Sequence, residues 1–88
     1  MYNILPYSYN KAKNLGVTII PSTKQYKKID VIKNDKIIAS IGDIRYDDYP
    51  TYLRKEGVTK ANERRRLYHI RHKDNKGLAG YYAKNILW

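Results

Sequence analysis

Apolar and polar residues alternate on either side of residues 34–36, as in a β-hairpin with one buried face. A two-residue turn at Asn34 and Asp35 would place Lys33 opposite Lys36 and scatter the apolar residues over both faces. A three-residue loop over 34–36 buries one face well, so we expect that loop. It pairs Ile29 with Ile41, Val31 with Ala39, Asp30 with Ser40 and Ile32 with Ile38.

A further strand is predicted over residues 17–20, where β-branched side chains lie between Gly16 and Pro21. After the hairpin, the turn residues 46–50 could start a short helix that continues through Leu53. These patterns predict a small antiparallel sheet of two or three strands.

The clearest helical pattern covers Lys60–Lys73, and Thr59 is its expected N-cap. At 3.6 residues per turn, Leu67 and Ile70 share one narrow apolar stripe, and we expect the helix to dock by this stripe. The opposite face carries Arg65, His69 and His72, with Arg66 and Lys73 close to it.

A second helix is predicted after a break at residues 74–77, because Leu78, Tyr82 and Ile86 recur every four residues. Its other side carries Tyr81, Lys84 and Trp88. The two helices and the sheet together predict an α+β fold, in which a small antiparallel sheet packs against two short helices.

Residues 1–14 show neither a strand nor a helix period, and Pro6 disfavours a helical conformation at Leu5. We therefore expect an extended N-terminal arm over 1–14, followed by a single small α+β domain over 15–88. The arm would become ordered only where its aromatic and aliphatic side chains find a surface.

A chain of 88 residues without Cys supports only a modest core and has neither a disulfide framework nor a thiolate metal site. Such a chain can gain stability from a protein partner. No apolar run reaches the roughly 18 residues that a spanning helix requires, so we expect an intracellular, soluble protein without a membrane span.

The chain contains ten Tyr, one Trp and no Phe. Two interpretations stay open. Tyr suits interfaces, because its ring is apolar while its hydroxyl prefers water or a hydrogen bond, but codon bias could equally have placed Tyr at core positions. On the first interpretation, the candidate anchors in neighbouring molecules are Tyr7, Tyr9, Tyr81 and Trp88.

Positive charge is concentrated in residues 54–76, where nine Lys or Arg stand against three acidic residues, a net charge of +6 out of +10 for the whole chain. Such a surface attracts phosphate, acidic protein or anionic lipid. The alternative is a basic helix face that is exposed to solvent and binds no partner. The candidate binding residues are Arg64, Arg65, Arg66, His69, Arg71, His72 and Lys73.

The sequence argues against a catalytic or metal site. His69 and His72 have an i, i+3 spacing, but no Cys or third His accompanies them. Asp47 and Asp48 lie among turn residues and indicate a capped turn better than acid–base chemistry. No catalytic triad or phosphate-binding loop is present, so we expect no enzymatic activity, no metal and no cofactor.

Four features follow one another over residues 27–88: a hairpin ending in Gly, a Tyr-x-x-Tyr turn, an Arg-rich helix with an Arg-His pair, and an aromatic tail ending in Leu-Trp. The residues are Gly42, Tyr46 to Tyr49, Arg65 to Lys73, Tyr81-Tyr82 and Ile86-Leu87-Trp88. This order resembles a family of short, basic, uncharacterised proteins encoded by large nucleocytoplasmic DNA viruses and some phages.

The resemblance implies a virus-encoded protein, located in the virion and, during assembly, inside the host cell. We expect a minor structural protein of the capsid or virion that cements larger coat subunits within a hetero-oligomeric assembly. The alternative is a nucleic-acid-binding protein for DNA packaging or regulation, with the same Arg-rich helix on phosphates. A third possibility is a small inhibitor or adaptor that docks on a host enzyme.

Overall fold

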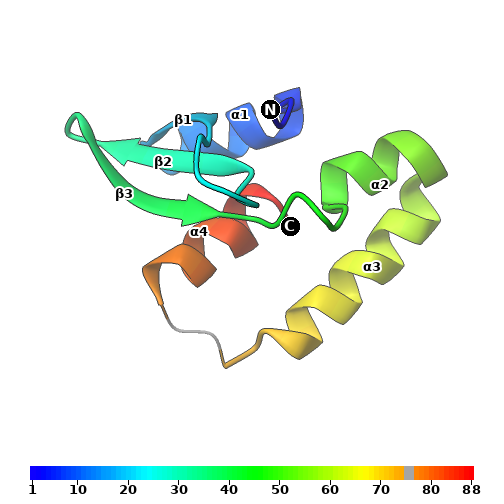
Figure 1. Ribbon diagram of the computed structural model, residues 1–88. Coiled ribbons are helices and arrows are strands. Elements are labelled where there is room, and N and C mark those ends of the chain that lie inside the picture. The colour runs from blue at the N-terminus through cyan, green and yellow to red at the C-terminus, as the bar shows by residue number, and fades with distance from the viewer. Residues whose placement is uncertain (75–76) are drawn as a thin grey trace.

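A three-stranded antiparallel sheet in the order β1-β2-β3 lies at the centre of the computed structural model, which describes residues 1–74 and 77–88 (Figure 1). Its strands are β1 (Thr18–Pro21), β2 (Ile29–Lys33) and β3 (Lys36–Ile41). The described helices are α1 (Pro6–Asn14), α2 (Tyr49–Glu56), α3 (Val58–Arg71) and α4 (Leu78–Ile86). The predicted α+β fold with a small antiparallel sheet is confirmed, with four helices in place of two.

The hairpin turn differs from the prediction, although most of the register agrees. Asn34 and Asp35 form a two-residue turn with φ angles of 53° and 63°, which short polar side chains tolerate, and Lys33 does face Lys36. A β-bulge then makes Ile38 an extra residue, because Ile32 pairs with Ile37. The bulge restores the other three predicted pairs: Ile29 with Ile41, Asp30 with Ser40 and Val31 with Ala39.

The prediction of an extended arm over 1–14 is wrong for residues 6–14, which form α1. Leu5 is extended and Pro6 occupies the first turn, where a missing N–H and a fixed φ do no harm. Proline therefore starts this helix. Ile4 and Ala12 are buried in the core, so the segment is part of the folded domain.

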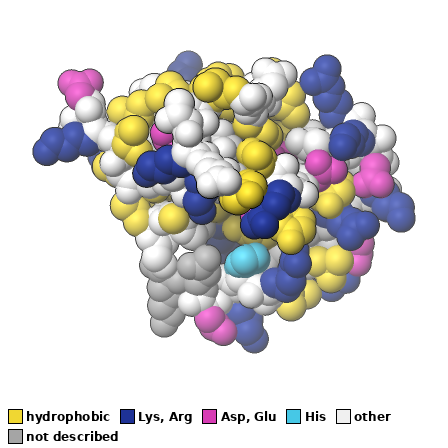
Figure 2. All heavy atoms as spheres, in the orientation of Figure 1, with side chains coloured by type: hydrophobic (Ala, Val, Ile, Leu, Met, Phe, Trp, Pro, Cys, Tyr) yellow, Lys and Arg dark blue, Asp and Glu magenta, His cyan; other side chains and the backbone are white. Residues whose placement is uncertain are grey.

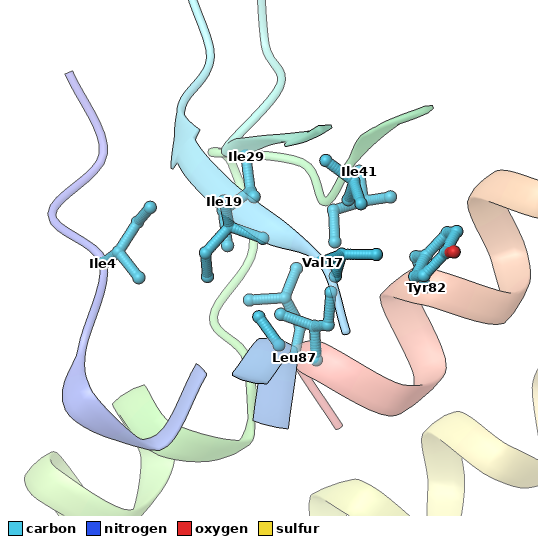
Figure 3. Close-up of a cluster of buried hydrophobic side chains, with 10 residues drawn as sticks. Ile4, Val17, Ile19, Ile29, Ile41, Tyr82 and Leu87 are labelled. Carbon is cyan, nitrogen blue, oxygen red and sulfur yellow. The ribbon is translucent and has the colours of Figure 1, made fainter. Parts of the chain in front are cut away.

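The hydrophobic core lies between the sheet and the pair α1 and α4, since α4 packs on β3 and α1 packs on both β1 and α4. Figure 3 shows the labelled side chains of the sheet and of the α4 region close together, with Ile4 from the segment before α1 to one side. The buried members include Ile4, Val17, Ile19, Ile29, Val31, Ile41, Tyr82, Ile86 and Leu87. The predicted stripe of α4 is buried at Tyr82 and Ile86, whereas Leu78 is exposed.

Backbone carbonyl groups at the end of α4 and just beyond it accept hydrogen bonds from other parts of the chain. The Ser8 hydroxyl donates to the carbonyl of Ile86 (3.0 Å), and the Tyr7 hydroxyl donates to that of Trp88 (3.3 Å). The Tyr49 N–H donates to the carbonyl of Leu87 (3.0 Å). Since a helix end leaves carbonyls without intrahelical partners, these bonds fix residues 86–88 against α1 and α2.

A buried network around Asp48 joins three segments. Its carboxylate caps α2 by accepting hydrogen bonds from the Thr51 N–H (3.1 Å) and hydroxyl (2.7 Å), which confirms the capped turn. The other oxygen accepts from the Tyr2 hydroxyl (2.6 Å) and pairs with Lys28 (2.7 Å). Burial and this carboxylate raise the pKa of Tyr2 far above its usual value. The network ties residue 2 to Lys28, just before β2, and to the start of α2.

The prediction that Thr59 caps the long helix is wrong, because α3 begins at Val58 directly after Gly57. Gly57 has a φ of 87° and its N–H donates to the carbonyl of Leu53 (3.2 Å), so one glycine ends α2 and begins α3. Helix α3 ends at Arg71 instead of Lys73, and the predicted break at 74–77 includes residues 75–76, which lie outside the described residues.

Candidate functional site: a cationic groove beside α3

Helix α3 packs mainly against α2, and together they stand beside the sheet (Figure 1). Its buried residues are Ala61 and Tyr68, whereas Leu67 and Ile70 stay 38% and 54% exposed. The prediction that α3 docks by its Leu67 and Ile70 stripe is therefore wrong. The apolar stripe instead faces outward.

Arg65 takes the inward position that was expected for an apolar residue. Its guanidinium carbon lies 4.1 Å from the centre of the Tyr49 ring, and its Nη2 donates to the side-chain oxygen of Asn62 (3.2 Å). An arginine can occupy such a place because its stem covers apolar surface and its cationic head is attracted to the face of the ring. Arg65 is thus a structural residue of the α2–α3 pair.

His69 is also half-buried, and its Nδ1 atom has no hydrogen-bond partner within the described residues. Burial lowers the pKa of His69, and the nearby cations Lys84, Arg65 and Lys11 lower it further. Both effects favour the neutral imidazole, which makes His69 a poor cationic contact for phosphate.

Three aromatic rings stack along the inner side of α3. Trp88 lies parallel to Tyr68, with centroids 4.3 Å apart and an interplanar angle of 6°. Tyr68 in turn stacks on His72 at 4.3 Å, and burial raises the pKa of Tyr68. Trp88 and Tyr7 both contact their own chain, so the expectation that they are seated in other molecules is not supported by their positions.

A groove of about 760 Å³ separates α3 from α4 and the end of β3. Leu67 and Ile70 line one wall. The opposite wall and the floor are formed by Ile41, Gly42, Ala79, Gly80, Ala83 and Leu87, with Trp88 and Tyr68 at the side. These walls are apolar and α4 contributes only small side chains to them, whereas charged and polar side chains form the rest of the lining.

Basic side chains border this groove. Arg64 and Arg71 line it from α3, and Lys27 lines it from the sheet side. None of these three forms a salt bridge within residues 1–74 and 77–88. The acidic lining residues Asp43 and Asp47 are paired with Arg45 (2.7 Å) and Lys55 (3.3 Å). Arg64 lies over the Tyr52 ring, with its guanidinium carbon 5.5 Å from the ring centre. The rim consequently presents positive charge that no carboxylate of the described residues neutralises.

The remaining candidate residues lie apart from the groove or are already paired. Arg66 pairs with Glu63 (2.7 Å), and this bond lowers the pKa of Glu63. Tyr9 and Tyr81 are about half exposed. Lys73 is exposed just beyond α3. Figure 2 shows Lys and Arg side chains beside hydrophobic ones on the α2–α3 side of the molecule.

Several groove residues were not singled out from the sequence, chiefly Lys27, Ala79, Gly80 and Ala83. The four-residue spacing of Ala79 and Ala83 places both on one face of α4, and this signal could have indicated a shallow wall. Lys27 carries no such signal, because only the folded sheet brings it opposite α3.

None of the helices in residues 1–74 and 77–88 is both long and apolar enough to cross a membrane. In the same part of the chain, no three His, Cys, Asp or Glu side chains gather as metal ligands. Comparisons of the chain with protein-family models, with curated proteins and with solved structures each find no match. The groove and its charges are therefore the basis for assigning a function.

Proposed function

We propose that this protein is a minor structural protein of a viral particle, without enzymatic activity, which holds larger coat subunits together by binding an acidic part of their surface. The observation that carries the proposal is the exposure of Leu67 and Ile70 between the unpaired cations Arg64 and Arg71. An apolar centre with a charged rim is typical of protein interfaces.

Binding to the coat subunits does not require an extended N-terminal arm or a Trp88 side chain seated in a neighbour. Ile4, Ala12, Ile86 and Leu87 are buried in the core of this chain, and the Ser8 hydroxyl donates to the carbonyl of Ile86, so these residues do not bind a neighbour. What supports it is the groove beside α3, together with the viral origin that the sequence resemblance implies. On this proposal the protein resides in the virion and, during assembly, inside the host cell.

Quantitative mass spectrometry of particles purified from the source of this sequence tests the proposal. We expect the protein in a fixed ratio to the major coat subunit, and Arg64→Glu with Arg71→Glu should reduce that ratio strongly. Lys33→Glu with Lys36→Glu changes the net charge equally at the hairpin turn and should leave it unchanged. A protein absent from particles has no such structural role.

A nucleic-acid-binding role is the second candidate, favoured by the net charge of +10 and the unpaired cations along α3. It predicts binding to duplex DNA at low salt, with a log–log salt slope of about −0.9 for each phosphate contacted. Arg64→Ala with Arg71→Ala should then flatten the slope by about two contacts. No binding at about 50 mM salt excludes this role.

A further inference from the structure

We infer that the groove binds one α-helix of the larger protein, a helix with an apolar face flanked by acidic residues. This inference rests on the proposed function and names the partner of the same site. It starts from the walls of the groove, which are themselves helices: α3 supplies Leu67 and Ile70, and α4 supplies Ala79, Gly80 and Ala83.

The side chains that line the groove suit the close approach of a helix. Side chains on α4 are small where they line it, so a third helix can approach that wall closely, while Leu67 and Ile70 project from α3. An amphipathic helix laid in such a groove covers apolar side chains spaced at i, i+3, i+4 and i+7. Helix α3, which packs mainly on α2, would thereby gain a second packing partner.

Charge selects the occupant. A second copy of this chain also carries a net charge of +10, so two copies repel each other. Lys27 on one side and Arg64 and Arg71 on the other are placed to pair with acidic residues that flank an apolar face. Nucleic acid would pair with the cations, but it would place charged phosphates against the apolar side chains of Leu67 and Ile70. A helix with an apolar face covers these two side chains without burying a charge.

The single Trp of the chain, Trp88, lines the groove and supplies an intrinsic probe. The ligand in the test is a Trp-free peptide of about 15 residues, roughly four helical turns, with Leu on one face and Glu on its flanks. A control peptide of identical composition spreads its Leu around the helix. We expect the first peptide to change Trp88 fluorescence saturably and to bind at least tenfold more tightly than the second.

Matched variants then locate the binding. Ile70→Ser removes an apolar side chain that is 54% exposed in the groove, and Ile37→Ser removes one that is 52% exposed on β3, outside it. We expect about tenfold weaker peptide binding for the first and no change for the second. Arg71→Glu should weaken binding more than Lys33→Glu, although both change the net charge by the same amount.

Three results would overturn the inference. These are equal binding of the two peptides, equal effects of Ile70→Ser and Ile37→Ser, and no saturable binding up to about 1 mM peptide. A duplex DNA oligonucleotide that competes with the peptide and binds Ile70→Ser normally would assign the groove to nucleic acid instead. Failure of the peptide experiment would refute the helix inference but not the proposed function. The protein could still be retained in particles through its exposed arginines, without a helix in the groove.

Discussion

Replacing Gly42 by alanine tests how closely the chain packs where the end of β3 forms the floor of the groove. A Cβ atom at this position would lie 2.8 Å from Leu87 Cδ1 and 2.9 Å from Lys28 Cδ, and the residue has a φ of +77°. The unfavourable φ costs about 1 kcal/mol and the overpacking about 2 kcal/mol. We therefore expect Gly42→Ala to lower the free energy of unfolding by about 3 kcal/mol.

Thermal and urea unfolding monitored by circular dichroism measure this change, which corresponds to a fall in Tm of roughly 12 to 24 °C for a chain of this size. Gly16→Ala is the matched control, because Gly16 has a φ of +73° but no heavy atom within 4 Å of the added carbon. It should lose only about 1 kcal/mol. Equal losses in the two variants would refute the close packing of Gly42 against Leu87 and Lys28.

Three further predictions concern the fold. Asp48→Asn deprives the buried Lys28 of its charged partner, so urea unfolding should show a free energy of unfolding lower by about 3 kcal/mol. Asp47→Asn removes the partner of a more exposed pair and should lower it by less than about 1 kcal/mol. The pKa of His69 is lower in the folded than in the unfolded protein, so the folded state binds fewer protons there. The free energy of unfolding should therefore fall as the pH drops below about 6.5. His69→Gln should weaken this pH dependence, measured by urea unfolding at several pH values. Asp35→Gly relieves a φ of 63° and should raise the free energy of unfolding by about 0.5 kcal/mol, measured by thermal unfolding, whereas Asp35→Ala should not.

Local sequence patterns correctly predicted those elements in which the buried residues recur with the period of a strand or a helix. The apolar alternation in 29–41 gave the pairing of Ile29 with Ile41 correctly, since burial of one face fixes the register at the open end of the hairpin. It could not reveal the turn, because a bulge near Ile38 absorbs the extra residue without changing that face. The repeat of Tyr82 and Ile86 likewise predicted a buried helix face.

Long-range contacts decided the parts that the sequence did not predict. Helix α1 packs against α4, where the Ser8 hydroxyl donates to the carbonyl of Ile86, and no local sequence period indicates this contact between distant parts of the chain. The orientation of α3 depends on the Tyr49 ring, which attracts Arg65 inward. A helical wheel assigns the apolar side to the core by default, and that default fails where an arginine stacks on a buried ring.

The orientation of α3, with its apolar stripe outward, explains how the groove arises from the fold. By turning Arg65 and Tyr68 toward the protein, the helix leaves Leu67 and Ile70 partly in water, where each forgoes roughly 1 kcal/mol of the stabilisation that full burial would provide. Rotating α3 to bury them would expose Tyr68 and break its stack with Trp88, a larger apolar loss. The helix is therefore held in a position where residues 1–74 and 77–88 leave both aliphatic side chains partly exposed. Arg64 and Arg71 beside them form no salt bridge within those residues, so they favour a covering molecule with acidic flanks.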